Sequence, residues 1–575
     1  MSASSKKKLR KEENAARMTE KQKREQKEAK QLKIYTRVFA IIMVVVLVVG
    51  IGVLVKDPIE RAVIRNSHAI TVGEHKISAA DLNYFYMDAI SKHQEDVYNQ
   101  YGQSFGDYWT IMLGFEPSKP LNEQNYDTKT GKTWATYFAE TAVKNAREMY
   151  SLYIEANAKG YKIPADEQAD VDAYLESLDL YAAYSGLNSA NEYLRMTYGS
   201  SANYDDYSRY YNICTLAASY LDKYSADLEY KPEDYRAYEK DKFDDYTSFS
   251  LAHYTIRMNS YLGEGTKDEN GNAVYSEADK AAAREALKAD LETILGQEIK
   301  DKASFDKAIQ SLTINQTDKD GKPIVDSKKP TATEIKDAFL EDIVIHADAL
   351  EWIKETNRVP GEIKAFDVYT YAEHEDPEHE HDDDCGCART TDGYTIVLFN
   401  ERNENKVNLV NVRHILVKFE GGTKGEDGNT VYSEVEKETA KTAAEKLLQQ
   451  WKDGKANEDS FAELANKESD DQGGKVTNGG LYEDVFPGQM VENFENWCFA
   501  EGRQAGDTGI VETEYGYHVM YYVSADEMTY RDLLIEVDLR NEDTEKWRDA
   551  LIEKTPYEEV DLSRLDYGIV LNRSH

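Results

Sequence analysis

Val412-Arg-His-Ile-Leu-Val417 is the stretch of sequence from which the fold of this chain can be worked out. Its largely apolar residues predict a strand over 412–419, and a similar run predicts a second strand over 518–523. Between them, apolar residues at helical spacing predict an amphipathic helix over 434–451, and a shorter helix follows over 460–467. This part of the chain therefore alternates strands with helices.

The same order of blocks occurs earlier in the chain, which indicates an internal repeat. Leu251-Ala-His-Tyr-Thr-Ile256 parallels the first stretch, and Gly393-Tyr-Thr-Ile-Val397 parallels Gly516-Tyr-His-Val-Met520. The remaining matched blocks are Asn270–Glu277 with Asp427–Glu434, Ser304-Phe305 with Ser460-Phe461, and Trp352, Arg358 and Gly361 with Trp497, Arg503 and Gly506. Matches in one order are hard to obtain by chance, so we expect two copies of one domain, at 246–406 and 407–527.

The segments on either side of the repeat carry helical patterns. The region 56–245 is rich in tyrosine and contains an apolar helical pattern over 133–158, ended by Gly160 and followed by Pro164, which is typical of the start of a helix. The last segment, 528–575, predicts a helix over 542–554 and a short apolar strand over 567–571. The region 56–245 shows no constellation of catalytic side chains.

The charge of the chain is strongly acidic and unevenly distributed. The net charge is −38, yet residues 1–37 hold 13 Lys and Arg against 5 Asp and Glu. The remainder holds 56 basic against 102 acidic residues. Nucleic-acid binding needs clustered lysine and arginine, so this balance argues against DNA or RNA as a partner.

Val38 to Val55 is an uncharged, strongly apolar run of 18 residues. As a helix it would be about 27 Å long, close to the thickness of the hydrocarbon core of a bilayer. The basic segment 1–37 should remain in the cytoplasm, which leaves the bulk of the chain outside a cell membrane that it crosses once. A cleaved signal peptide is the alternative, but the run is long for one and no A-x-A cleavage pattern follows it.

Cysteines are few, and two of the four lie in a short cluster of metal-ligating residue types. Cys214 and Cys498 sit in apolar helical patterns, so no disulfide framework is expected. The cluster consists of His374, His379, His381, Cys385 and Cys387. These ligands suit a transition metal such as zinc, nickel or copper, and the alternative is a solvated acidic loop.

The second copy resembles the parvulin family of peptidyl-prolyl cis/trans isomerases. The blocks that carry the resemblance are Val412–Val417, Ser460-Phe-Ala-Glu-Leu-Ala465, Gly479-Gly-Leu481, Gly488-Gln-Met490 and Tyr515-Gly-Tyr-His-Val519. The resemblance implies a compact α+β domain with a small antiparallel sheet wrapped by helices and no required cofactor. The whole arrangement is similar to the anchored extracytoplasmic foldases of Gram-positive bacteria, in which a mostly helical chaperone-like domain precedes a parvulin domain.

The resemblance also assigns roles to individual residues. The apolar pocket for the proline ring would consist of Leu481, Met490 and Phe494, for which ordinary core packing is the alternative. The polar groups implied for the catalytic site are His414, Asp471, Thr513, Tyr515 and His518. The histidines would face each other in a hydrogen-bond network. Tyr515 stands where the family usually has a small hydroxyl residue, so it departs from the pattern.

The first copy departs much further from the family. It keeps His253 but has Thr395 in place of the second histidine, and it lacks the blocks around the proline pocket. We therefore expect a degenerate, non-catalytic copy. The predicted function is isomerase and chaperone for unfolded or nascent secreted polypeptides that contain Xaa–Pro bonds. The alternatives are a non-catalytic polypeptide-binding holdase or scaffold and a metal-handling surface protein, and the sequence leaves the oligomeric state open.

Overall fold

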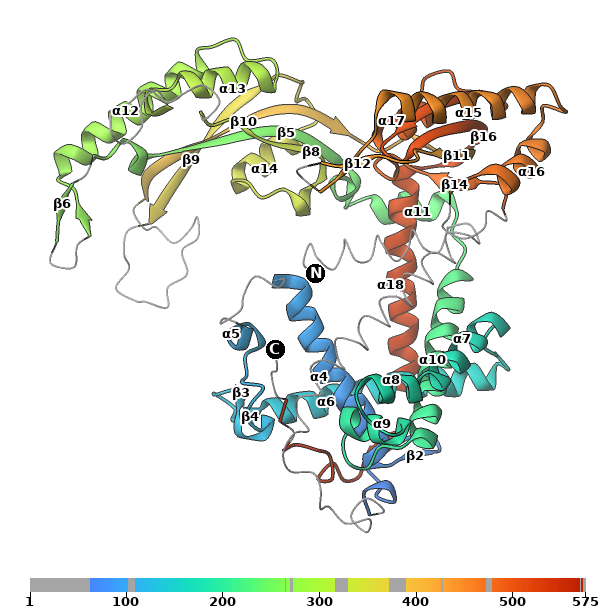
Figure 1. Cartoon of the computed structure of the whole chain (residues 1–575). Helices are drawn as coiled ribbons and strands as arrows, with labels where there is room; N and C mark the ends of the chain where they lie inside the picture. The colour runs from blue at the N-terminus through green and yellow to red at the C-terminus, as the bar shows by residue number, and fades with distance from the viewer. Residues whose placement is uncertain are drawn as a thin grey trace. The chain divides into compact units, whose positions relative to one another are not determined.

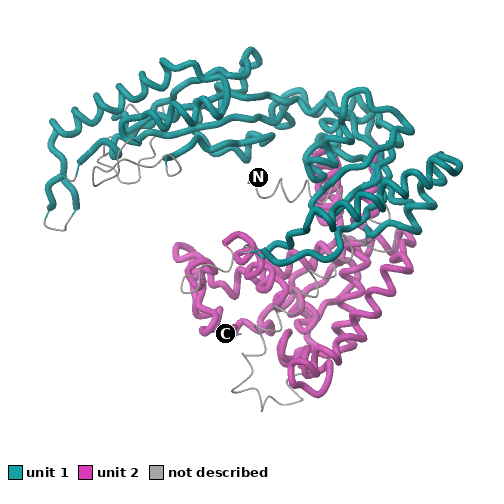
Figure 2. The backbone as a smooth tube through the Cα atoms, turned by 45° about the horizontal axis from the view of Figure 1, so that its top comes forward, with its two compact units in different colours: residues 1–17, 230–537 teal, residues 18–229, 538–575 magenta. Residues whose placement is uncertain are grey.

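The computed structural model describes residues 63–101, 109–263, 265–268, 272–315, 329–371, 389–425, 428–471, 478–568 and 570–571. Within them the chain forms two compact units (Figure 1, Figure 2): residues 230–537 make one, and the described residues up to 229 together with those from 538 onward make the other. The predicted anchor, 38–55, and the basic segment before it lie outside the described residues. No helix in the described part is long and apolar enough to cross a membrane.

Residues 230–537 contain two antiparallel four-stranded sheets with equivalent strand orders. The order in the first sheet is β8-β5-β10-β9, formed by Thr333–Phe339, Ser248–Arg257, Arg389–Asn403 and Ile363–Tyr371. The order in the second sheet is β14-β11-β16-β15, formed by Leu481–Val485, Asn408–Lys418, Gly516–Thr529 and Thr508–Thr513. In each sheet the central pair consists of the strands that carry the repeated sequence blocks.

The pairing register of the central strands agrees with the alignment of the two copies. His253 lies opposite Val397 in the first sheet, as His414 lies opposite Met520 in the second. A shift by one residue would exchange the two faces of a strand, so the shared register puts aligned residues on the same face of each sheet. A two-stranded hairpin follows the first strand of each copy, β6-β7 (Thr266–Lys267 and Ala273–Val274) and β12-β13 (Thr423–Lys424 and Thr430–Val431).

The helices also follow the same order in the two copies. They are α12 (Glu277–Leu295), α13 (Lys302–Ser311) and α14 (Ala347–Lys354) in the first, and α15 (Glu434–Lys452), α16 (Glu458–Glu468) and α17 (Glu492–Cys498) in the second. The predicted helices at 434–451 and 460–467 are confirmed as α15 and α16. Ser433 and Asn457 explain where they begin, since each side chain accepts a hydrogen bond from the backbone in the first helical turn.

The second sheet is covered by apolar side chains on both faces. Ile415 and Val519 pack with Phe461 and Ala444 of the helices α16 and α15 on one face. Val412 and Met520 pack with Phe494 of α17 on the other. Successive side chains of a strand point to opposite faces, so β11 supplies both cores. The face toward α17 is the one that carries His414.

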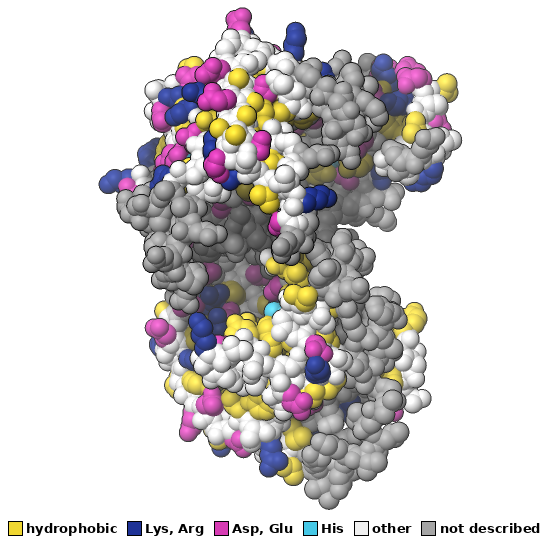
Figure 3. Space-filling model, turned by 90° about the vertical axis from the view of Figure 1, so that its left-hand side faces the viewer, with side chains coloured by type: hydrophobic (Ala, Val, Ile, Leu, Met, Phe, Trp, Pro, Cys, Tyr) yellow, Lys and Arg dark blue, Asp and Glu magenta, His cyan; other side chains and the backbone are white. Residues whose placement is uncertain are grey.

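The other unit is mostly helical, as its sequence pattern predicts. Its helices are α4 (Ala79–Tyr101), α5 (Trp109–Leu113), α6 (Trp134–Ala158), α7 (Ala165–Glu176), α8 (Leu178–Tyr184), α9 (Ala190–Tyr198) and α10 (Tyr204–Ala226). A short hairpin, β3 (Asn125–Asp127) with β4 (Lys132–Thr133), precedes α6. The Thr133 side chain caps α6 by accepting from the backbone N–H of Thr136 at 3.2 Å. On the face that Figure 3 shows, acidic and basic side chains are interspersed with apolar ones.

The end of the chain differs from its prediction in position. The last helix, α18, spans Tyr530–Lys554, so it begins well before residue 542. The last strand, β17, is Tyr557–Glu559 and pairs with β1 (Ile70–Val72), which also pairs with β2 (His75–Ile77). The described residues within 567–571 are not in a strand; Leu571 is buried in the helical core instead. The sequence did not predict β17 as a strand because two of its three residues are glutamates.

A further helix, α11 (Pro232–Glu239), begins the 230–537 unit.

Tyrosines form much of the core of the helical unit and enclose one carboxylate. The Tyr210 hydroxyl donates a hydrogen bond to Asp88. The rings of Tyr84 and Tyr207 pack against Tyr210 and against each other, and the ring of Tyr198 packs against Tyr84. Burial raises the pKa of Asp88 from 3.8 to about 6, although the hydrogen bonds from Tyr210 and Tyr198 act in the opposite direction.

Replacing Asp88 with asparagine should change how the stability of this unit depends on pH. A carboxyl group with a raised folded-state pKa favours folding at low pH, and that contribution is lost as the pH rises through about 6. We therefore expect Asp88→Asn to gain stability relative to the wild type between pH 4 and pH 7, by at most about 3 kcal/mol. Urea unfolding at a series of pH values measures this difference. A mutant-to-wild-type difference that is constant over that range would contradict the prediction.

Candidate active site

Two buried histidines face each other on the central strands of the second sheet. His414 on β11 is 2% exposed and His518 on β16 is 6% exposed. Their Nδ1 atoms lie 3.0 Å apart, within hydrogen-bond distance. The strand register explains the contact, because His414 pairs with Met520 and so lies diagonally across from His518 on the same face.

The histidine pair is the middle of a longer chain of hydrogen bonds. Nε2 of His414 lies 3.2 Å from Oδ2 of Asp471, and Nε2 of His518 lies 2.9 Å from Oγ1 of Thr513. The backbone N–H of Tyr515 donates to the same Thr513 oxygen at 3.2 Å. The structure therefore brings together four of the five polar residues predicted for the site through their side chains, and Tyr515 through its backbone.

One arrangement of protons satisfies all of these hydrogen bonds while both imidazole rings stay neutral. An ionised Asp471 only accepts, so Nε2 of His414 must carry the proton that points toward it. Nδ1 of His414 then accepts from Nδ1–H of His518, and Nε2 of His518 accepts from the hydroxyl of Thr513. Every ring nitrogen has a partner, which fixes the orientation of both imidazoles.

His518 is held in its neutral form. Burial and the neighbouring His414 ring lower its pKa from 6.5 to about 3, while Asp471 acts in the opposite direction. The unfolded chain would bind a proton at this residue between pH 6.5 and 3 that the folded chain does not bind. The contribution of this histidine to stability is therefore lost as the pH falls through that window.

Tyr482 is a member of the site that the sequence did not reveal. Its hydroxyl donates to Oδ2 of Asp471 at 3.0 Å, and its ring centroid lies 4.7 Å from that of His414. The contact depends on the pairing of β14 with β11, which is irregular between Val410 and Val412. Strand alternation alone could have found Tyr482 only if that register had been known.

The predicted apolar residues differ in how they meet the histidines. Phe494 is 2% exposed, and its ring lies edge-on to His414 and His518 at centroid distances of 5.6 and 5.3 Å. Met490 is partly buried against the same cluster of apolar side chains. Leu481 lies opposite Arg413 on β11 and, among the described residues, does not belong to that cluster. The Tyr515 side chain is 57% exposed.

The first copy keeps only one of the two facing histidines. His253 stands at the position of His414, whereas Thr395 stands at the position of His518, and its hydroxyl lies 2.9 Å from that of Thr255. His253 is partly exposed, and burial lowers its pKa. Aligning Trp352 with Trp497 aligns helix α14 of the first copy with α17 of the second. In this alignment Ala349 corresponds to Phe494. The ring that packs on the histidines is therefore absent from the first copy.

The predicted metal ligands, His374 to Cys387, lie outside the described residues. Within the part of the chain that the structure describes, no group of three or more His, Cys, Asp or Glu side chains is placed to hold a metal ion. The free cysteines of the described part are Cys214 and Cys498. Burial raises the pKa of Cys498 to about 12, so it is a protonated core residue.

Comparison with known proteins finds a family that matches the part of the chain holding this site. The family model of the PPIC-type PPIASE domain matches residues 394–524. This segment therefore contains a peptidyl-prolyl isomerase domain of the parvulin type. Over part of its length the chain is similar in sequence to proteins named foldase protein PrsA. It is 34% identical over 118 residues to foldase protein PrsA 1 of Listeria innocua, a match that covers 20% of this chain and 31% of the relative.

Other similar proteins carry the same name. Foldase protein PrsA of Exiguobacterium sibiricum is 35% identical over 86 residues, which cover 15% of this chain and 26% of the relative. The chain thus spans about a third or less of the length of the curated relatives it matches. The solved structure of PrsA from Bacillus subtilis is 21% identical, with 29% of this chain and 56% of that chain covered and a TM-score of 0.18. PrsA from Bacillus anthracis is 19% identical, with 26% and 59% covered and a TM-score of 0.17.

Proposed function

We propose that the chain is a foldase that isomerises Xaa–Pro bonds in unfolded or nascent secreted polypeptides, and that 407–527 does the catalysis. The observation that carries this proposal is the buried His414–His518 pair between Asp471 and Thr513, with the Phe494 ring packed on both imidazoles. The matching PPIC-type domain supports the same reaction.

The reaction needs no nucleophile. Rotation about the peptide bond has a barrier of about 20 kcal/mol, because the planar amide is stabilised by resonance. A catalyst must bind the twisted amide more tightly than either planar isomer. In our proposal Phe494 and Met490 hold the proline ring, with Leu481 at the edge of this pocket. The hydrogen bonds from Asp471 through the histidines to Thr513 fix the side chains beneath this pocket and the direction of their dipoles. These groups therefore need not reorganise when the amide twists.

Asp471 has the most direct polar role in this proposal. Its Oδ2 atom receives hydrogen bonds from His414 and Tyr482, which hold the carboxylate in one place. A fixed negative charge beside the rotating amide favours the form in which carbonyl conjugation is lost. Thr513 and the histidines act as positioning residues. The exposed Tyr515 side chain lies at the rim, where it contacts the polypeptide rather than the reacting bond.

The remaining parts of the proposal rest on sequence. The uncharged run 38–55 anchors the chain in the cell membrane as a single span with the basic N-terminus in the cytoplasm. The helical unit and the degenerate first copy bind polypeptide. The cluster from His374 to Cys387 binds a transition metal through its imidazoles and thiols. A holdase without catalysis is the competing function, and it predicts polypeptide binding without faster isomerisation.

The test of catalysis is the rate of cis/trans exchange of an Xaa–Pro peptide, measured by NMR exchange spectroscopy with the full chain. We expect protonation of His518 to cause no change in the acceleration between pH 5 and pH 8. This range lies well above its pKa of about 3, so the ring stays neutral throughout. A folded chain that binds the peptide but leaves the exchange rate unchanged would support the holdase instead.

A further inference from the structure

An open cleft of about 920 Å³ lies in the helical unit, apart from the histidine site in sequence and chemistry. Strand β2, the start of α4, helices α6 and α10, and the segment joining α6 to α7 all contribute to its lining. Tyr150, Tyr153 and Tyr161 supply aromatic surface, and Asn157, Gln168 and Asn212 supply amide groups. Aromatic rings next to amide groups suit an extended polypeptide, whose backbone needs hydrogen-bond partners along its length.

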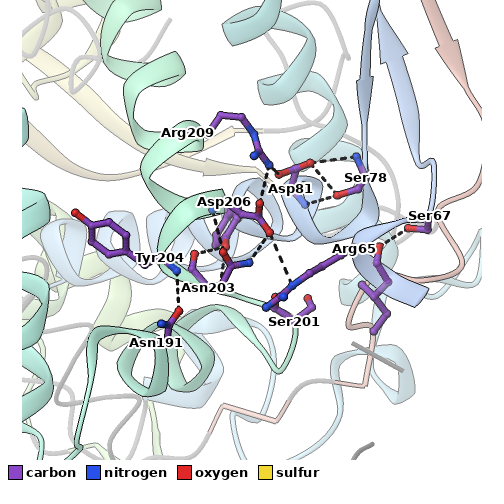
Figure 4. Close-up of polar contacts among 12 residues, drawn as sticks. Arg65, Ser67, Ser78, Asp81, Asn191, Ser201, Asn203, Tyr204, Asp206 and Arg209 are labelled. Atoms are coloured by element: carbon purple, nitrogen blue, oxygen red, sulfur yellow. Dashed lines mark hydrogen bonds and ion pairs between the residues drawn. The ribbon is translucent and has the colours of Figure 1, made fainter. Parts of the chain in front are cut away.

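Two of the lining residues, Asp81 and Arg209, belong to a network of charged side chains, which Figure 4 shows. Arg209 on α10 donates to Asp81 at 2.6 Å and to Asp206 at 3.0 Å, and Arg65 lies 3.8 Å from the second oxygen of Asp206. The hydroxyl of Ser78 donates to Asp81 at 2.8 Å. The arginines and carboxylates of this network therefore neutralise one another and join the start of α4 to α10.

Two lysines of the lining are different. Lys76 on β2 and Lys162 in the segment before α7 are exposed and have no ion-pair partner among the described residues. Asp81 is the single carboxylate among the described lining residues, and Arg209 already neutralises it. The cleft thus presents two lysines without an ion-pair partner among the described residues beside tyrosine rings, although the whole chain carries a net charge of −38.

We infer that this cleft binds acidic segments of unfolded polypeptides in an extended conformation. Lys76 and Lys162 pair with carboxylates of the bound segment, the tyrosines contact its apolar side chains, and the amide side chains contact its backbone. This inference extends the proposed foldase function to a second site, which holds the polypeptide independently of proline. It stands or falls separately from catalysis, because it requires no isomerase activity.

The probe is a fluorescein-labelled, proline-free peptide of alternating acidic and leucine or serine residues, and its matched control replaces each Asp and Glu by Asn and Gln. Fluorescence anisotropy with the full chain measures both affinities. We expect the acidic peptide to bind about tenfold more tightly than the neutral one at low salt, and the preference to fall as salt is raised. Equal affinities for the two peptides, or no binding of either, would overturn the inference.

Two double variants and one control locate the effect. Lys76→Gln with Lys162→Gln should remove most of the preference for the acidic peptide, and Lys76→Glu with Lys162→Glu should reverse it. Lys144→Glu is the control, since Lys144 is exposed on α6 but does not line the cleft. It should change the affinity by less than about twofold. A loss as large in Lys144→Glu as in the cleft variants would show general charge attraction and overturn the site. The variants replace exposed side chains, so circular dichroism should remain unchanged.

Discussion

Replacing Phe494 with alanine should lower the rate of catalysed Xaa–Pro exchange by at least about tenfold, the effect of losing roughly 1.4 kcal/mol of transition-state binding. The ring is almost fully buried and packs on both imidazoles, so its loss would open the floor of the proposed proline pocket and free the histidines. The same change should cost about 3–5 kcal/mol of stability, since a large buried side chain leaves a cavity. NMR exchange spectroscopy gives the rate, and urea unfolding gives the stability.

A second variant separates activity from folding. Met490 is only partly buried, so Met490→Ala should reduce the exchange rate at a smaller cost in stability. Its matched control is Ile345→Ala, because Ile345 holds the aligned position in the first copy and is also partly buried. The control should leave the rate unchanged. If Phe494→Ala and Met490→Ala fold and keep the wild-type rate, these residues do not form the proline pocket.

Replacing Arg531 with alanine should destabilise the 230–537 unit by about 3–5 kcal/mol, the usual cost of breaking a buried ion pair. The side chain is 3% exposed and pairs with Glu239 at 2.5 Å. Its guanidinium also donates to the carbonyl oxygens of Phe243 at 2.8 Å and Tyr246 at 3.1 Å, and lies 4.0 Å from the centroid of the Phe243 ring. Alanine would leave the carboxylate and both carbonyls without this partner.

The control for Arg531 is an ion pair that water reaches. Lys437 and Glu512 lie 3.0 Å apart, with 34% and 42% of their side chains exposed. Lys437→Ala should therefore cost no more than about 1 kcal/mol. Urea unfolding measures both variants. An Arg531→Ala chain that unfolds at the same urea concentration as the Lys437→Ala chain would show that this buried cluster contributes little to stability.

The elements of the second copy could be predicted from the sequence because local signals agreed with one another. Helix α15 has a capping residue, Ser433, directly before an apolar helical pattern, and β11 has a run of strand-forming residues around His414. The facing histidines were expected from the family resemblance, and the register of β11 with β16 puts both rings on one face of the sheet.

The contacts that the sequence did not reveal depend on long-range packing. Tyr482 reaches Asp471 only because β14 pairs irregularly with β11. Strand β17 forms only because β1, which lies far away in the sequence, offers an edge to it, and its own residues are mostly acidic. In the sequence, Arg531 looks like any other charged residue at the start of a helix. Its hydrogen bonds to the carbonyls of residues 243 and 246 appear only in the folded structure. None of these contacts has a local pattern.

The most direct test of the central proposal is the exchange rate of one Xaa–Pro peptide with three forms of the full chain: wild type, His518→Thr and His253→Ala. His518→Thr gives the second copy the residue that the first copy has at position 395, and so removes the facing imidazole. We predict that the wild type accelerates exchange, that His518→Thr loses most of the acceleration while circular dichroism shows a folded chain, and that His253→Ala matches the wild type. A wild-type chain without acceleration, or a loss in His253→Ala rather than in His518→Thr, would contradict the assignment of catalysis to the second copy.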